Sequence, residues 1–137
     1  MRLDHITIVA ADCSALRHFF VEVAGLTEGA RPPLGSAGHW LYLGGQALLH
    51  LIERGDPATR GDGTSSINSG ALWLPRIDHL ALRIDDGPQW QALLQRLQAR
   101  QLPYHVTTIE ALQERQLFVR PAPGVTVEFV IAAHHLV

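Results

Sequence analysis

The chain has 137 residues, 47% of them hydrophobic, and a formal net charge of -2 at pH 7. Its length and apolar content suit one compact domain, or two half-domains that share a core, while the charge and the lack of a basic run argue against nucleic acid as a partner. No apolar stretch is long enough to cross a bilayer, and the single cysteine, Cys13, excludes an internal disulfide framework.

These properties lead us to expect a soluble protein that acts on small molecules. Every basic residue is an arginine, which excludes Schiff-base chemistry through a lysine amine. The N-terminus enters a predicted strand without a signal segment, so a cytoplasmic location is the default expectation.

The first predicted element is a strand over residues 3–9, which contains the dipeptide Asp4-His5. Side chains alternate along a strand, so Ile6 and Ile8 share one face and His5 lies on the other. We expect the aliphatic face to lie beneath a helix. His5 then points away from that helix.

The next segment is predicted to be helical, because Leu16, Phe19, Phe20 and Val23 have the i, i+3, i+4, i+7 spacing of an amphipathic stripe. A glycine, Gly25, then ends the helix.

A hairpin follows in the first half of the chain, formed by predicted strands over residues 39–43 and 47–53. On its second strand His50 lies on the face opposite Leu49 and Leu51. The polar segment 54–75 is rich in Gly, Ser, Asp and Thr and is expected to link the two halves.

The second half repeats the order of the first. A strand over residues 77–83 contains Asp78-His79, and the helical stripe that starts at Trp90 lies as far behind His79 as the first stripe lies behind His5. Three more strands are predicted, over residues 104–108, 115–120 and 125–131. We therefore predict a single α+β domain of two βαβββ modules, about 1–53 and 76–134, with a mixed sheet and the helices outside.

Alternation places four polar residues on the strand faces that point away from the helices: His5, His50, His79 and Glu128. This is a set of metal ligands, because imidazole binds first-row transition metals and two histidines with one carboxylate form the facial triad of non-haem iron oxygenases. A lone inward histidine is more often satisfied by a backbone carbonyl. Three histidines and a glutamate at matching positions of a repeat favour a metal site instead.

The order of these motifs resembles the vicinal oxygen chelate superfamily. Asp4-His5 and Asp78-His79 open the two halves, His50 closes the first, and Glu128 closes the second. The superfamily includes glyoxalase I, methylmalonyl-CoA epimerase, fosfomycin-resistance thiol transferases, extradiol dioxygenases and bleomycin-resistance proteins. The resemblance covers essentially the whole chain and implies an open, cup-shaped sheet, one divalent metal ion (Fe, Mn, Zn, Ni or Co) at its base, and a homodimer.

The sequence also departs from this family. The turn at residues 121–125 keeps only the glycine of the Asp-Pro-x-Gly-Asn turn found in many relatives. Glyoxalase I relatives usually carry glutamate or glutamine at the position of His50. A histidine there makes the site more cationic, which favours stabilisation of an oxyanion. We expect His50 and Glu128 to be the catalytic residues, with His50 as a fourth metal ligand or as a base.

Further residues are candidates for substrate binding. Arg83 shares the face of His79, where it would bind a substrate carboxylate or phosphate, or else form a salt bridge at the rim. Tyr42, Phe118 and Arg120 lie on strands beside the ligands and are expected to line the pocket. Core packing is the alternative role for the aromatic residues.

Two kinds of function fit this pattern. The first is a metal-dependent enzyme that chelates adjacent substrate oxygens, either a ring-cleaving oxygenase or a lyase or isomerase. The second is a binding protein of the bleomycin-resistance type that sequesters a small molecule without converting it. A thiol transferase is a further possibility, although no clear thiol-binding or antibiotic-binding signature is present.

Overall fold

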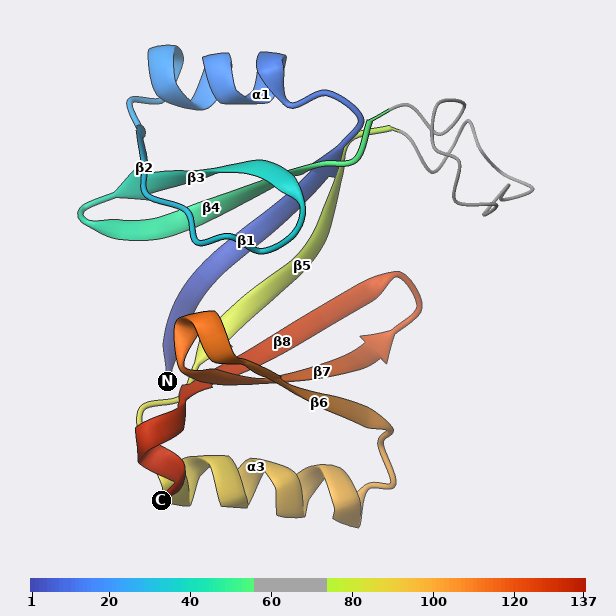
Figure 1. Ribbon diagram of the computed structural model, residues 1–137. Coiled ribbons are helices and arrows are strands. Elements are labelled where there is room, and N and C mark those ends of the chain that lie inside the picture. The colour runs from blue at the N-terminus through green and yellow to red at the C-terminus, as the bar shows by residue number, and fades with distance from the viewer. Residues whose placement is uncertain (56–73) are drawn as a thin grey trace. The chain divides into compact units, whose positions relative to one another are not determined.

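The computed structural model describes residues 1–55 and 74–137 (Figure 1). The chain divides into two compact units, which we call the N-terminal unit, Ile6–Asp78, and the C-terminal unit, Met1–His5 with His79–Val137. Most of the predicted linker, residues 56–73, lies outside the described residues.

The N-terminal unit combines a mixed sheet with a short helical segment. Its elements are, in chain order, β1 (Arg2–Ala10), α1 (Ser14–His18), the π-helical η1 (Phe19–Val23), β2 (Thr27–Gly29), β3 (Ala37–Leu43) and β4 (Gln46–Glu53). From Ile6 onward β1 pairs in parallel with β4. β4 pairs in antiparallel with β3, and β3 pairs in antiparallel with β2. The short strand β2 was not predicted individually.

The core of this unit lies on the face predicted from alternation. Leu49 and Leu51 of β4 pack with Leu41 and Cys13, and Ile6 and Ile8 of β1 join the cluster. Side chains of the helical segment complete it, namely Leu16, Phe20 and Val21. Burial raises the pKa of the Cys13 thiol to about 11, which agrees with a structural role for this cysteine.

The predicted helical stripe is only partly correct. Leu16 and Phe20 pack on the core, but the side chains of Phe19 and Val23 are 50% and 68% exposed. The reason is the π-helical turn, in which the amide of Ala24 donates to the carbonyl of Phe19 at 2.9 Å. A wider turn shifts the angular positions of successive side chains, so the i, i+3, i+4, i+7 rule no longer selects one face.

The C-terminal unit has the same order with a longer helix. Its elements are β5 (Arg76–Arg83), α3 (Gly87–Ala99), β6 (Tyr104–Ile109), the 3₁₀ turn η3 (Glu110–Leu112), β7 (Glu114–Ala122), β8 (Val125–Ala132) and the 3₁₀ turn η4 (Ala133–Leu136). β5 pairs in parallel with β8, which pairs in antiparallel with β7, and β7 pairs in antiparallel with β6.

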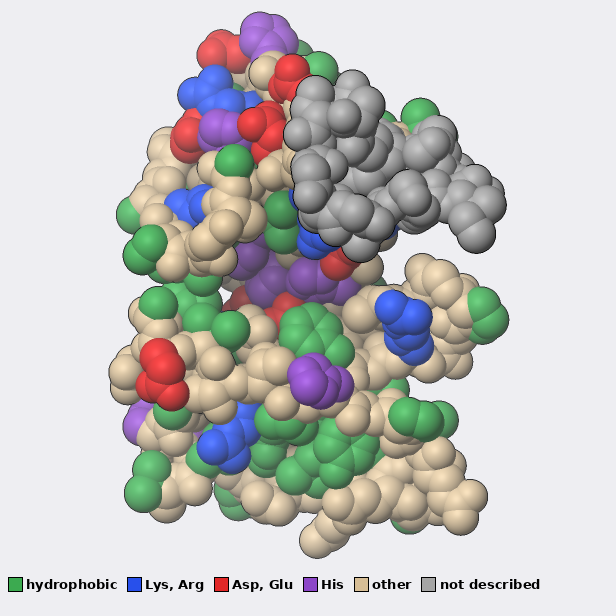
Figure 2. All heavy atoms as spheres, turned by 45° about the vertical axis from the view of Figure 1, so that its right-hand side comes forward, with side chains coloured by type: hydrophobic (Ala, Val, Ile, Leu, Met, Phe, Trp, Pro, Cys, Tyr) green, Lys and Arg blue, Asp and Glu red, His purple; other side chains and the backbone are tan. Residues whose placement is uncertain are grey.

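Helix α3 covers one face of this sheet (Figure 1). Its start is well defined, because Asp86 caps the helix by accepting a 2.8 Å hydrogen bond from the amide of Gln89, and Pro88 lies in the first turn. Trp90, Leu93 and Leu97 then pack on the sheet with Leu117, Val119 and Ile131. Hydrophobic side chains also reach the surface beside α3 in the face drawn in Figure 2.

Among the described strands the order is β2-β3-β4-β1 in the N-terminal unit and β5-β8-β7-β6 in the C-terminal unit. With the two helical segments this is the predicted α+β class. No helix in residues 1–55 and 74–137 has the length and hydropathy needed to span a membrane.

Candidate metal centre

Three predicted ligands meet inside the C-terminal unit: His5 of β1, His79 of β5 and Glu128 of β8. Their candidate ligand atoms all lie within 4.8 Å of one another. Glu128 Oε2 lies 2.9 Å from His79 Nε2 and 3.4 Å from His5 Nε2. Ala81 pairs with Glu128 in the β5–β8 register. His79 precedes Ala81 by two positions, so its side chain lies on the same face of the sheet as Ala81 and Glu128. We call these three residues the ligand group.

The ligand group is withdrawn from solvent. Glu128 is 1% exposed and His5 is 5% exposed. An ionised carboxylate at such a position is costly unless cations or hydrogen-bond donors compensate it. Glu128 Oε2 contacts the two imidazoles, but the buried Oε1 has no hydrogen-bond partner within the described residues. The donor set therefore fits a cation: it offers two imidazole nitrogens and a carboxylate with an unsatisfied buried oxygen.

Three charged side chains form a chain of hydrogen bonds that ends at His5 Nδ1. His5 Nδ1 donates to Asp4 Oδ2 at 2.7 Å. The other Asp4 oxygen accepts from Arg83 Nε, and Arg83 also donates through its terminal nitrogen to Glu114 Oε1. A carboxylate on Nδ1 fixes the orientation of a ligand imidazole and turns its Nε2 toward the metal position. In this structure Nε2 is the His5 atom that faces Glu128.

These contacts shift the pKa values of the groups involved. Burial acts to raise the pKa of Asp4, but hydrogen bonds from His5 and Arg83 outweigh it and lower the pKa from 3.8 to about 2. Burial acts to lower the pKa of His5, yet hydrogen bonds to the carboxylates of Asp4 and Glu128 raise it above 6.5. The same contacts lower the pKa of Glu128 against the effect of its burial. These shifts favour the ionised form of the Asp4 and Glu128 carboxyl groups.

The fourth predicted ligand, His50, lies in the N-terminal unit. It pairs with Thr7 across β1–β4, on the sheet face opposite the core. Its ring stacks on Trp40 with centroids 4.1 Å apart and planes 10° apart. Its Nε2 lies 3.0 Å from the carbonyl oxygen of Ala47. A carbonyl only accepts, so Nε2 is the donor in this contact.

No protein-family model and no curated protein sequence matches the chain. Solved structures do match. Methylmalonyl-CoA epimerase from Mycobacterium tuberculosis is 24% identical with a TM-score of 0.64, and the match covers 96% of this chain and 88% of that one. A variant of methylmalonyl-CoA epimerase from Streptomyces coelicolor, in complex with 2-nitronate-propionyl-CoA, is 22% identical with a TM-score of 0.64, over 98% of this chain and 96% of that one.

A 2,3-dioxygenase from Pseudomonas is 16% identical with a TM-score of 0.69, over 96% of this chain. This chain spans only 40% of the length of that dioxygenase. Both kinds of neighbour are vicinal oxygen chelate enzymes. The chain has the vicinal oxygen chelate fold. At these identities the comparison establishes the fold alone, so the activity has to be argued from the residues of this chain.

Within this vicinal oxygen chelate fold, the structure brings together three of the four residues predicted as metal ligands. His5, His79 and Glu128 form the ligand group, and His50 lies in the other unit with its own contacts. The predicted substrate residue Tyr42 also belongs to the N-terminal unit, where its hydroxyl donates to the carbonyl of Ala30.

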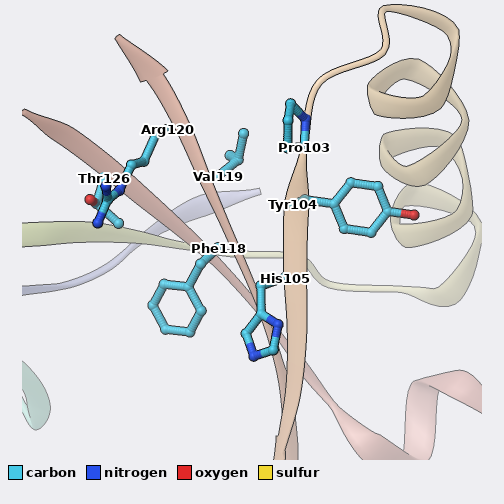
Figure 3. Close-up of a pocket in the computed structure, with 7 residues that line it drawn as sticks. All are labelled: Pro103, Tyr104, His105, Phe118, Val119, Arg120 and Thr126. Atoms are coloured by element: carbon cyan, nitrogen blue, oxygen red, sulfur yellow. The ribbon is translucent and has the colours of Figure 1, made fainter. Parts of the chain in front are cut away.

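The remaining predicted substrate residues lie in the C-terminal unit. Arg83 forms the salt bridges to Asp4 and Glu114 that were the alternative to substrate binding. Phe118 meets the ring of His79 edge-on, with centroids 5.8 Å apart. Phe118 and Arg120 both line an open pocket of about 610 Å³, shown in Figure 3.

Sequence reasoning missed two residues that support the ligand group. Asp4 carried a usable signal, since it forms part of the repeated Asp-His dipeptide, yet strand alternation alone places it on the face opposite His5. Its carboxylate nevertheless reaches His5 Nδ1. Glu114 carried no such signal, because its contact with Arg83 joins residues 31 positions apart in the chain.

Proposed function

We propose that this chain is a divalent-metal-dependent enzyme that binds two adjacent oxygens of a small organic substrate and stabilises an oxyanion. The observation that carries the proposal is the ligand group, in which a buried Glu128 with an unsatisfied Oε1 lies against the Nε2 atoms of His5 and His79. The cytoplasmic location and the homodimer expected from the sequence remain parts of the same proposal.

The composition of the ligand group supports a transition metal. Two imidazoles and one carboxylate with open positions suit Fe, Mn, Co, Ni or Zn better than Mg or Ca. A bound divalent ion supplies Lewis-acid polarisation of the substrate oxygens. One carboxylate against two positive charges leaves the site cationic, which favours an oxyanion over a neutral substrate.

The residues of the chain have separate tasks in this proposal. Asp4 keeps Nδ1 of His5 occupied, so that Nε2 is the ligand atom. Arg83 and Glu114 hold Asp4 in turn. Phe118 packs edge-on against His79 and restricts its ring. His50 is proposed as a fourth ligand or as the proton-transferring base, since an imidazole can titrate near neutral pH.

Two reaction types remain within the proposal, and each has one supporting observation. The composition of the ligand group, two histidines and one carboxylate, favours oxygenation, since an iron oxygenase site of this type would need no fourth protein ligand. The similarity to epimerases favours isomerisation, because they are 24% and 22% identical to this chain, whereas the dioxygenase is 16% identical.

Metal uptake is the first test of the proposal. Protein purified without oxygen and dialysed against excess metal should hold one ion per chain by elemental analysis. His79→Ala should lose most of the ion, because a ligand is removed, whereas His134→Ala should keep it, because His134 lies in η4 outside the ligand group. Full retention by His79→Ala would overturn the proposed site, because the ion would then be bound elsewhere. No uptake by the unaltered protein would overturn the proposal and favour a binding protein that uses no metal.

A second test separates the two reaction types. An oxygenase loaded with Fe(II) or Mn(II) should consume oxygen with catechols and continue to do so as His50→Gln. An isomerase should need no oxygen, should work with Co, Ni or Zn, and should lose its activity as His50→Gln, because the base is removed. An oxygen electrode and a proton-exchange assay distinguish these outcomes.

A further inference from the structure

We infer that the pocket beside the ligand group binds an oxyanion at the far end of the substrate, so that the substrate is an apolar-bodied organic acid or phosphate ester. This inference rests on the proposed function, because it takes the chelated end of the substrate to lie at the ligand group. The opposite end of the substrate then carries the oxyanion, and Arg120 is the residue that binds it.

Phe118 connects the pocket with the ligand group. Across the β7–β8 pair it lies opposite Glu128, and across the β6–β7 pair it lies opposite His105. Its ring also contacts His79. Residues that face each other in a sheet point to the same side, and Figure 3 shows His105 and Phe118 projecting together from neighbouring strands while Tyr104 turns toward the helix. A molecule bound at Glu128 and His79 therefore extends over the ring of Phe118 on its way to the pocket.

The charge of the pocket is positive. Its lining comprises Pro103, Tyr104, His105, Phe118, Val119, Arg120 and Thr126, none of which is acidic. Arg120 is exposed, and within the described residues no salt bridge is found for it. A guanidinium binds a carboxylate or phosphate through two parallel hydrogen bonds, and the hydroxyl of Thr126 supplies a further donor.

The geometry gives an approximate length for the substrate. Paired residues such as Glu128 and Phe118 have Cα atoms about 5 Å apart. Arg120 follows Phe118 by two positions, a rise of about 7 Å along the strand, and lies where the β7–β8 register shifts between Val119 and Ala122. These perpendicular steps separate the Cα atoms of Glu128 and Arg120 by about 9 Å. An aromatic or aliphatic body over Phe118 fits between a chelating end and an anionic end at this separation.

The test compares a charged probe with a neutral one. 3-(3,4-Dihydroxyphenyl)propionate carries a chelating catechol, an apolar body and a carboxylate, and its methyl ester keeps the catechol and the body but replaces the carboxylate by a neutral ester. Their binding to zinc-loaded protein is measured by titration calorimetry without oxygen, so that no turnover occurs. We expect the acid to bind about tenfold more tightly than the ester, since a hydrogen-bonded charge pair contributes on the order of 1.5 kcal/mol. The phosphate monoester of 2-(3,4-dihydroxyphenyl)ethanol shows whether carboxylate or phosphate is preferred.

Arg120→Gln should abolish the preference for the acid and leave the affinity for the ester within about twofold. Arg115→Gln is the matched control. It removes the same charge from the same strand, but Arg115 is exposed on the opposite face of β7, so the preference for the acid should persist. A general loss of cationic charge would weaken acid binding equally in both variants.

The outcomes separate this inference from the proposed function. Equal affinity for acid and ester, or a preference that survives Arg120→Gln, overturns the inference while metal binding still stands. Failure of both probes to bind a fully zinc-loaded protein also overturns it. If the protein takes up no zinc, the proposed function fails first and the inference falls with it.

Discussion

At the scale of single residues, Asp4 connects a candidate metal ligand to the charged groups behind it. One of its oxygens accepts from His5, and the other accepts from Arg83. The residue binds no metal in the proposed site. Its effect on the metal is exerted through the orientation and basicity of the His5 ring.

Replacing this carboxylate gives the first prediction. Asp4→Asn should lower metal affinity by about 10- to 100-fold, the usual range for the loss of a carboxylate that holds a ligand histidine. Competition with a chromogenic chelator measures the affinity. The control is Asp85→Asn, since Asp85 also ties the start of β1 to the end of β5, through Met1 and Arg2, but is exposed and contacts no ligand. An equal loss in both variants would mean that the effect is only the tethering of strands.

The pH dependence of stability gives the second prediction. Asp4 has a pKa of about 2 in the folded protein and 3.8 as its ordinary value. Between these values the unfolded chain binds more protons, so the stabilisation by Asp4 is present above pH 4 and is lost as the pH falls toward 2. It amounts to at most about 2 kcal/mol. Urea unfolding of the metal-free protein should show a flatter pH slope in this window for Asp4→Asn. Parallel slopes would contradict the prediction.

The same residues show how far a sequence reaches. Strand alternation together with the repeat predicted that His5, His79 and Glu128 lie close together, as they do, but the same reasoning also included His50, which lies in the other unit. It could not predict the contact of Asp4 with His5, which depends on side-chain rotation, or the part played by Glu114, which depends on the pairing of distant strands. Residue types indicated the candidate ligands. The contacts of Asp4 and Glu114 became visible only in the three-dimensional structure.

At the scale of elements, the two helical segments illustrate why one prediction succeeded and the other succeeded in part. In α3 the cap at Asp86, the proline in the first turn and the apolar stripe all indicate the same helix. The first segment has an apolar stripe too, but no side chain caps the start of α1, and the chain continues as a π-helical turn. Hydrogen-bond spacing within a helix is set by packing, which periodicity does not record.

The cap of α3 gives the third prediction. Asp86→Ala should lower the free energy of unfolding by about 1 kcal/mol, because the amide of Gln89 loses its acceptor. Denaturant unfolding measures the change, and Asp86→Ser, which retains an acceptor, should recover most of it. Metal affinity should be unchanged in both variants. A change in metal affinity as large as that of Asp4→Asn would show that α3 is coupled to the site.

At the scale of the whole molecule, metal binding and folding should be linked. The ligand group joins three strands that are far apart in the sequence, so an unfolded chain cannot present it as a preformed site. A ligand that binds only the folded state stabilises it by about 2.7 kcal/mol at a concentration 100 times its dissociation constant.

The fourth prediction follows from this linkage. Zinc should raise the unfolding temperature of the full chain, and removal of zinc by a chelator should reverse the increase. His79→Ala should show little or no increase, while His134→Ala should behave like the unaltered chain. Differential scanning calorimetry provides the measurement. An equal increase in His79→Ala would place the stabilising ion elsewhere.

The division of β1 between the two units has a kinetic consequence. Met1–His5 belongs with the residues after His79, although the rest of the strand belongs to the N-terminal unit. One ligand thus comes from the beginning of the sequence and another, Glu128, from near its end. Contacts between such distant positions form slowly, because the long intervening loop must close before they become favourable. On the ribosome, β1 therefore emerges before β5 and β8 have been synthesised, and the proposed metal site cannot form until β8 is present.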